Sequence, residues 1–501
     1  MDFAMLEILL PCFLLFCSWR LLKARSLSTR DEGFPTVVSV IPWVGAALGL
    51  AQDSFNFMHK CWGKYGGGYK IPIQSGNIAI FCSEEGMKDV FRDKTRSFNA
   101  GAGHRIGIRL IGGVDMDLQG VHLYDKDLGP VISRAFLTTN GLDLIVPTYG
   151  MKLFEFLSNL SNDLGDSNRM FNLTTLMGQS LYKNASVAVF GDHFPDNTFD
   201  DFMHLDENFS RLMIPIPFYS RSALQARNRL LQSIQSYVRS VWTGSQVEGA
   251  PRFASELITA LKGTDLSDKD QAGLLLAFMW GMHANTIRVA GFLFIHLLSD
   301  HQAFTKVREE IDSILKSSYA DDVKTFLETP YSSVPRDEFP LLDSAVKETL
   351  RLSVLLSNLR EAQREVEVDY GTGKRARVRK GDLVLLNMGS YFRDEAVCSD
   401  ADNFRFDRFV SGENTPALSA FGGGAHMCKG RLVAVHEIKV LFILFTRFFE
   451  MSLVDEKGAP LREKLPPPET RSTAVSRPSD KIHIRLRRKP SKSTRSIVQG
   501  P

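Results

Sequence analysis

A single cysteine in a glycine-rich loop is the residue best placed to do chemistry in this sequence. The segment from Phe421 to Arg431 reads FGGGAHMCKGR, and a long apolar segment follows it. Gly424 and the two glycines before it let backbone approach a bulky ligand closely. A helix that begins near Gly430 has a partially positive N-terminus, which favours the thiolate form of Cys428. The loop therefore predicts an anionic sulfur held for a metal and covered from solvent by a phenylalanine.

The whole string, Phe-x-x-Gly-x-His-x-Cys-x-Gly, resembles the haem-binding signature of the cytochrome P450 family. The resemblance implies haem b (iron protoporphyrin IX) with Cys428 as its metal ligand. The same loop then supplies further cofactor-binding residues, namely Phe421, Gly424, His426 and Gly430. Two positions depart from the family pattern. His426 stands where Arg is usual and can still donate to a haem propionate, and Lys429 stands where Pro is frequent.

Glu348 and Arg351 lie three residues apart in the helical segment LLDSAVKETLRL, so their side chains share one helix face. On its own this spacing is also that of an ordinary surface ion pair. It resembles the family's Glu-x-x-Arg, and Asn403–Phe409 resembles the family segment that adds a further Arg. The resemblance implies a buried structural ion network of Glu348, Arg351 and Arg408. Arg360 falls where the family often places a propionate contact, although it also suits a surface position.

The segment 278–288, FMWGMHANTIR, resembles the family's long central helix over the haem. That helix usually carries an acid and an alcohol that relay protons to bound oxygen. Here no acid is present, and either Ala284–Asn285 or Asn285–Thr286 occupies the pair. An asparagine can hold water by hydrogen bonding but is not a carboxylic acid. The Ala-Asn-Thr string, with Val435–Lys439 and segment 41–50, resembles the sterol 7α-hydroxylase and prostacyclin synthase branch.

The resemblance implies a haem-thiolate monooxygenase that oxidises an apolar small molecule, such as a terpenoid, sterol or polyketide-like compound, in specialised metabolite biosynthesis. It uses O2, and no flavin or nicotinamide motif is apparent, so electrons come from a separate NADPH–cytochrome reductase. The missing acid leaves open an isomerase or dehydratase that acts without reductase. A non-catalytic haem- or lipid-binding protein is a third reading. Expected substrate-contact regions are 100–120, 205–220, 280–288 and 354–359.

The elements that position these residues are expected to be mainly α-helical, with small β-sheets, in a cytochrome P450 fold. Helical patterns dominate from about 130 to 315, a long buried helix is expected over 274–298, and a last helix over 430–449; strands are expected at 69–82 and 362–386. The 501 residues are 44% hydrophobic and 23% charged, as in globular proteins. A net charge of +3 gives no sign of a nucleic-acid partner, and six scattered Cys exclude a disulfide scaffold.

The N-terminus predicts a membrane anchor helix. Residues 3–22 are apolar over about the ~20 residues that cross a bilayer. Basic residues follow this stretch and only Asp2 precedes it, which favours a single-pass protein of the endoplasmic reticulum membrane with a cytosolic catalytic domain. A buried N-terminal helix is the alternative. The expected division is an anchor at 1–25, a linker at 26–45, the haem-thiolate domain at 46–488 and a basic disordered tail at 489–501.

Overall fold

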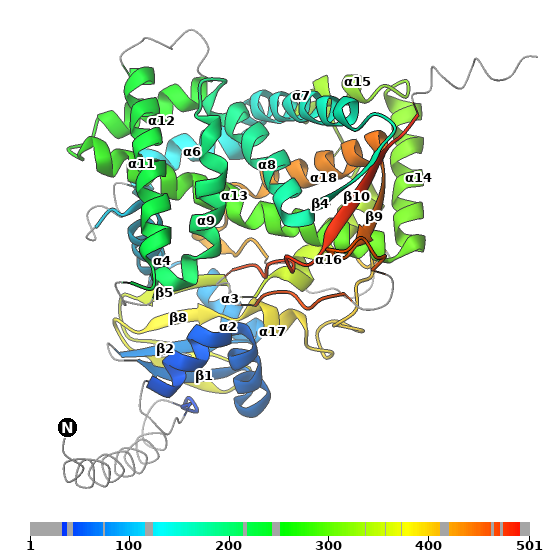
Figure 1. Cartoon of the computed structure of the whole chain (residues 1–501). Coiled ribbons are helices and arrows are strands. Elements are labelled where there is room, and N and C mark those ends of the chain that lie inside the picture. Colours follow the sequence, from blue (N-terminus) through cyan, green and yellow to red (C-terminus); the bar gives the residue numbers. More distant parts are fainter. Residues whose placement is uncertain are drawn as a thin grey trace, which may run out of the picture.

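The computed structural model describes residues 33–37, 44–73, 76–115, 124–213, 218–242, 251–335, 337–355, 357–371, 373–410, 420–461, 465–470 and 474–490. Figure 1 shows a body built mostly of helices, with a small sheet below it and strands along one side. The predicted fold class, mainly α with small β-sheets, is confirmed.

Helix α13 (Asp268–Ser299) runs through the middle of the molecule (Figure 1). Its N-cap is Ser267, whose Oγ accepts from Asp270 N at 3.2 Å and donates to the Asp270 carboxylate. The following residues are apolar on nearly every face, so the helix is buried by its neighbours, as the sequence predicted. Those in contact with it include α8 (Leu173–Phe190), α11 (Arg221–Trp242), α16 (Pro340–Ser353) and α18 (Arg431–Phe448).

The remaining helices enclose this centre. Their ends follow local signals: Thr138 caps α7, for example, by accepting from Gly141 N. The α-helices are α2 (Val44–Tyr65), α3 (Glu84–Phe91), α4 (Gly101–Gly107), α6 (Gly129–Leu137), α7 (Thr139–Leu164), α9 (Phe199–Glu207), α10 (Phe209–Leu212), α12 (Arg252–Lys262), α14 (His301–Ser318), α15 (Val323–Glu328) and α17 (Met388–Phe392). Shorter helical turns are η1 (Ile108–Gly112), η2 (Tyr124–Leu128), η3 (Asp196–Thr198), η4 (Tyr331–Ser333) and η5 (Gly424–His426).

A five-stranded sheet lies below the helices in Figure 1. Its order is β1 (Gly68–Ile73), β2 (Gly76–Phe81), β8 (Leu383–Leu386), β5 (Ser357–Ala362) and β3 (Phe98–Asn99). The pair β2–β8 is parallel, and the other pairs are antiparallel. In β8 buried and half-buried residues alternate, which is the period expected of a strand with two different faces. The predicted strands at 69–82 and within 362–386 are confirmed.

A second sheet, of order β4 (Asn168–Asn172), β10 (His483–Arg488) and β9 (Phe449–Val454), was not predicted. Most residues of β4 are exposed, so the apolar alternation that marks a strand is missing from its sequence. The two-stranded hairpin of β6 (Val366–Asp369) and β7 (Arg375–Val378) completes the strands of the described residues. Lys489 N donates to Phe448 O at 2.9 Å, so the first residue of the predicted tail is bonded to the body.

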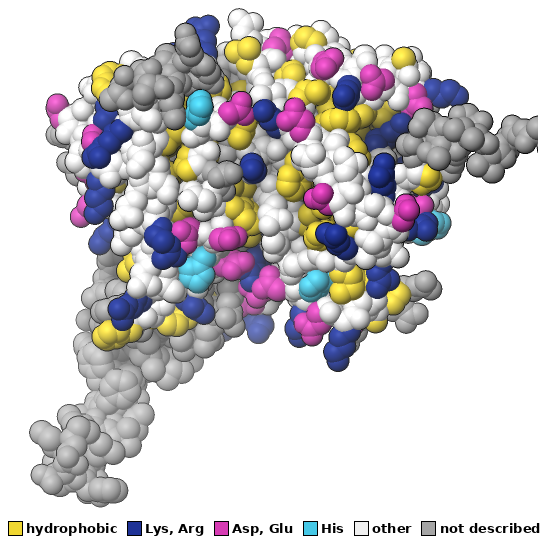
Figure 2. All heavy atoms as spheres, turned by 45° about the horizontal axis from the view of Figure 1, so that its top comes forward, with side chains coloured by type: hydrophobic (Ala, Val, Ile, Leu, Met, Phe, Trp, Pro, Cys, Tyr) yellow, Lys and Arg dark blue, Asp and Glu magenta, His cyan; other side chains and the backbone are white. Residues whose placement is uncertain are grey.

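The predicted anchor at 1–25 lies outside the described residues, as does most of the linker at 26–45 and the tail from 491 onward. Within the linker, the short segment 33–37 pairs with β1, and Val37 N donates to Lys70 O at 2.8 Å. Among the helices that the structure describes, none is both long enough and apolar enough to span a membrane. Figure 2 shows acidic and basic side chains interspersed on the face it presents, in keeping with the small net charge.

Candidate active site

The cysteine loop precedes α18 directly, as the sequence predicted. Cys428 N donates to Phe421 O at 2.9 Å, which closes the loop around the turn η5. Cys428 keeps solvent contact, although protein surrounds much of it. Burial raises the pKa of the Cys428 thiol, while the N–H groups of Gly430 and Arg431 and the Arg431 charge oppose that shift. The sulfur therefore lies where a helix N-terminus can stabilise its anionic form once a metal is bound.

Protein contacts account for two of the loop glycines. A Cβ on Gly424, where φ is +66°, would lie 2.2 Å from Phe91 O, and one on Gly423 would lie 2.6 Å from the Phe91 ring. Both positions therefore require glycine because the loop crosses the end of α3 at close range. Lys429 is also engaged elsewhere, since its Nζ donates to Gly129 O at 3.2 Å. The predicted contacts of Phe421, Gly424, His426 and Gly430 with haem remain predictions.

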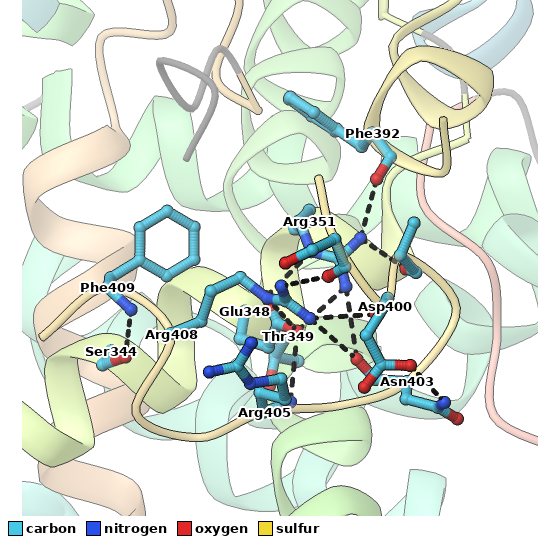
Figure 3. Close-up of polar contacts among 12 residues, drawn as sticks. Ser344, Glu348, Thr349, Arg351, Phe392, Asp400, Asn403, Arg405, Arg408 and Phe409 are labelled. Atoms are coloured by element: carbon cyan, nitrogen blue, oxygen red, sulfur yellow. Dashed lines mark hydrogen bonds and ion pairs between the residues drawn. The ribbon is translucent and has the colours of Figure 1, made fainter. Parts of the chain in front are cut away.

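Glu348, Arg351 and Arg408 are brought together by α16 and the segment that follows α17 (Figure 3). Glu348 Oε2 accepts from Arg351 Nε at 2.8 Å, and Glu348 Oε1 accepts from Arg408 Nε at 2.9 Å. All three side chains are at most 1% exposed. A surface ion pair, the alternative considered from the sequence, is excluded by this burial.

The same two guanidinium groups also bind backbone. Arg351 Nη1 donates to Phe392 O and Ala401 O, and Arg408 Nη1 and Nη2 donate to Ser399 O and Asp400 O, at 2.6–3.0 Å. Both guanidinium groups therefore have a carboxylate that balances their charge and backbone oxygens that accept their hydrogen bonds. A buried ion network needs both. The network ties α16 to the chain segment that leads into the cysteine loop.

Arg360 lies on β5 and is 5% exposed. Its Nη1 donates to the Leu359 carbonyl oxygen at 3.2 Å. Burial lowers the pKa of Arg360 to about 10, so the side chain is still a cation at neutral pH. A buried cation of this kind would suit an anionic propionate, and that role stays a prediction.

The least covered face of α13 carries Ala277, Gly281 and Asn285, which are spaced four residues apart. Nothing lies within 4 Å of a Cβ built on Gly281, so the helix is open at this point. Thr286 points elsewhere, because its Oγ1 donates to Met282 O at 3.0 Å and the residue is 6% exposed. Ala284 is 3% exposed and Asn285, which both registers share, is half-buried, so the choice between Ala284–Asn285 and Asn285–Thr286 stays a prediction.

A polar junction on α13 was missed by sequence reasoning. Asp206 of α9 accepts from Trp280 Nε1 at 2.8 Å and from Arg288 Nη2 at 2.6 Å. Arg288 Nη1 also donates to Val475 O at 3.1 Å. This junction joins three segments far apart in the sequence, with both ion-pair partners less than a tenth exposed. Arg288 within an otherwise apolar helix was the only signal available.

Two of the predicted substrate-contact regions reach α13, and a third lies in the sheet. The region 100–120 supplies η1, and a Cβ on Gly112 would lie 2.3 Å from Gly273 O, so the two segments touch through glycines. The region 205–220 supplies the end of α9 with its junction, and residues 357–359 begin β5, which contacts α4.

An accessible thiol at a helix N-terminus, a buried arginine and an open helix face together fit a haem group. The family sequence model for cytochrome P450 matches residues 35–484. Cytochrome P450 7B1 of Mus musculus is 24% identical over 484 residues and 91% of each chain. A 5-beta-cholestane-3-alpha,7-alpha-diol 12-alpha-hydroxylase of Sus scrofa is 21% identical over 95% of this chain and 96% of its own. Cytochrome P450 7A1 of Oryctolagus cuniculus is 28% identical over 56% of this chain and 57% of its own.

The chain therefore belongs to the cytochrome P450 family. Membership makes it a haem monooxygenase with an axial cysteine thiolate, O2 as oxidant and a redox partner that supplies electrons. The resemblance to the sterol 7α-hydroxylase branch is confirmed by the relatives named above. These relatives give no support to the predicted role in specialised metabolite biosynthesis.

Proposed function

We propose that this protein hydroxylates a sterol-like molecule, using O2 and electrons from a separate NADPH–cytochrome reductase. The observation that carries this proposal is the open face of α13 at Ala277, Gly281 and Asn285, together with the buried Asp206–Arg288 pair further along the helix. Arg288 follows Gly281 by seven residues, close to two turns of helix, so it shares that face about 10 Å further along. A rigid apolar body with an oxygen at one end suits this arrangement, and the Sus scrofa relative named above is a hydroxylase of a cholestane diol.

Each site residue has a definite task in this proposal. Cys428 holds the haem iron, which supplies oxygen activation when bound. The N–H groups of Gly430 and Arg431 stabilise the thiolate, and Arg360 meets a propionate. Asn285 holds a water molecule by hydrogen bonding beside the open face of α13. The Asp206–Arg288 pair meets the polar end of the substrate, which leaves an apolar carbon facing the iron.

One observation favours a second candidate, a haem-thiolate isomerase or dehydratase. Between residues 271 and 299 helix α13 contains no Asp or Glu, so the usual acid of the oxygen side is missing. His283 offers no substitute, because it is buried, its Nε2 hydrogen-bonds with Ser186 Oγ at 3.0 Å, and burial lowers its pKa to about 3. An enzyme that only rearranges its substrate needs neither proton relay nor electrons.

One assay separates the two candidates. Purified holoenzyme is incubated with a hydroxysterol panel, with and without NADPH and reductase, and products are identified by mass spectrometry. We expect a product one oxygen heavier that forms only with NADPH and reductase, and no product from Cys428→Ala, which also loses the carbon monoxide band of thiolate-bound haem. Equal product without electrons, or product of unchanged mass, would establish the isomerase or dehydratase instead.

The division of the chain is also proposed, on sequence grounds. Residues 1–25 form a single-pass anchor in the endoplasmic reticulum membrane, 26–45 a linker, 46–488 the cytosolic catalytic domain and 489–501 a basic tail. The support is the apolar stretch at 3–22 and the basic residues after it. The full chain should sediment with alkaline-washed membranes. A chain that starts at residue 26 should be released, and full release of the intact chain contradicts the anchor.

A further inference from the structure

The helical turn η1 stands directly beside the open face of α13. Gly273 precedes Ala277 of that face by one helical turn, about 6 Å along the axis, and continues the same row of residues. The end of η1 meets α13 at this point. A Cβ on Gly273 would lie 2.4 Å from Val114 Cγ2 and 2.5 Å from Gly112 O. The two segments therefore touch without a side chain between them, and η1 forms a wall at one end of the open face.

Arg227 of α11 holds this wall at its C-terminal end. Its Nη1 donates to Leu110 O at 3.1 Å and lies 3.4 Å from Arg109 O. Carbonyl groups at the end of a helical turn lack intrahelical partners, and a cation is favourable there. Gly113, which follows η1, has a φ of +68°, and a Cβ on it would lie 3.2 Å from Arg227 Cζ. The guanidinium group therefore packs directly on the turn that ends η1.

The bonds to η1 are the only hydrogen bonds that Arg227 makes among the described residues. The residue is half-buried, and burial lowers the pKa of its guanidinium group. Arg229, two residues further along α11, differs in both respects. Its Nη2 lies 2.6 Å from Asp201 Oδ1, and its side chain is 59% exposed. Arg227 thus gives up water for backbone carbonyl groups of η1, which couples α11 to the wall.

We propose that Arg227 is a positioning residue for the substrate. Through Leu110 O it holds η1 against α13, so that the wall is already in place when a bulky ligand enters. A preformed wall reduces the entropy that the protein loses on binding. Arg227 itself does not touch the ligand. This inference rests on the proposed open face of α13 as the substrate side, but not on a sterol as the substrate.

The test compares two azoles that coordinate haem iron, so no substrate needs to be known. Imidazole fills only the space next to the iron, whereas clotrimazole extends a bulky triaryl group along the pocket. Dissociation constants are measured on the holoenzyme from the shift of the haem absorption band. Arg227→Met keeps the aliphatic stem and removes the donors. We expect about tenfold weaker binding of clotrimazole and a change within about twofold for imidazole.

Two further substitutions on α11 separate this role from a general structural one. Arg227→Lys keeps a cation near Leu110 O and should hold clotrimazole binding within about threefold of the wild type. The matched control is Arg229→Met, which breaks the exposed pair with Asp201 and should stay within about twofold for both azoles. If Arg227→Met forms no holoenzyme, Arg227→Gln replaces it under the same criteria, because its side chain is too short to reach Leu110 O.

Gly273→Ala displaces the same wall from α13, because its Cβ would meet Val114 and Gly112 O. It should also weaken clotrimazole about tenfold, and adding Arg227→Met should then cost less than about a further twofold, since both changes act on one contact. The inference is overturned if Arg227→Met leaves clotrimazole unchanged, weakens both azoles equally, or adds in full to Gly273→Ala. It is also overturned, together with the open face, if the wild type binds imidazole but not clotrimazole. Failure of every hydroxysterol to react, with the azoles as expected, would overturn only the proposed function.

Discussion

Two glutamates on neighbouring helices are both buried, but one carboxyl group has charged partners and the other does not. Glu348 on α16 is fully buried, and its oxygens accept from two arginines and from Arg405 N. Glu437 on α18 is 3% exposed, and its Oε1 has no hydrogen-bond partner in the described structure. Burial raises the pKa of Glu437 to about 8. The helices α16 and α18 are in contact, so the two side chains belong to one core.

The difference lies in what surrounds each carboxyl group. An ionised carboxylate can be buried where cations and N–H donors replace its water, as around Glu348. Where they are missing, the group keeps its proton and is buried as a neutral acid, as at Glu437. The ion network around Glu348 stabilises the fold only while all its members are present, because loss of one leaves a buried charge unpaired. The buried neutral acid at Glu437 makes the free energy of unfolding depend on pH.

The largest effect is expected from Glu348→Gln. The change leaves Arg351 and Arg408 buried without a carboxylate, and breaking a buried pair in this way costs about 3–5 kcal/mol. We expect little or no holoenzyme, measured by the carbon monoxide band, and a strongly lowered midpoint of thermal unfolding. The matched control is Glu365→Gln, because Glu365 pairs with Arg377 on the surface. Normal haem content and stability in Glu348→Gln would show that the network does not hold the core.

A smaller, pH-dependent effect is expected from Glu437→Gln. Between about pH 4.5 and pH 8 the folded wild type holds a proton on Glu437 that the unfolded chain has lost. Wild-type stability therefore falls as pH rises through this window, by at most about 1.4 kcal/mol per pH unit. The variant cannot titrate, so its advantage over the wild type should grow from pH 5 to pH 8 and then level off.

Thermal unfolding of both proteins at pH 5, 6, 7 and 8 measures this difference. Glu365→Gln again serves as control and should run parallel to the wild type, because its carboxylate is exposed in both states. Parallel curves for Glu437→Gln and the wild type would mean that the pKa of Glu437 is not raised in the fold.

The cysteine loop and the Glu348 network could be predicted because their residues lie close in sequence or match short motifs. Spacing of three in a helix already places Glu348 beside Arg351. The Asp206–Arg288 pair gives no such signal, since 82 residues separate its members. Only the packing of α9 against α13 brings them together. The unpartnered state of Glu437 is equally invisible, because it depends on what the neighbouring helices fail to supply.

Sequence also gave only one of the reasons why some residues are needed. Gly423 and Gly424 were predicted to make room for a ligand, and the structure adds a second reason, because a Cβ at either position would meet Phe91 at the end of α3. The strands β4, β9 and β10 were missed because pairing between segments far apart, not local pattern, creates that sheet. Predictions from motifs therefore succeeded where the interacting residues lie close together in the sequence, and failed where distant segments pair.

The smallest effect is expected from an ion pair that joins α16 and α18 directly. Lys439 Nζ of α18 lies 2.8 Å from Asp343 Oδ1 of α16, with both side chains under a fifth exposed. Lys439→Met keeps the aliphatic stem and removes the charge, and Asp343 retains contact with Lys347 and with water. We expect a loss of about 0.5–1 kcal/mol in the free energy of unfolding and unchanged haem content. If Lys439→Met lowers the free energy of unfolding as much as Glu348→Gln does, then solvent exposure does not weaken the contribution of this ion pair. The large effect of Glu348→Gln would then not be specific to a fully buried network.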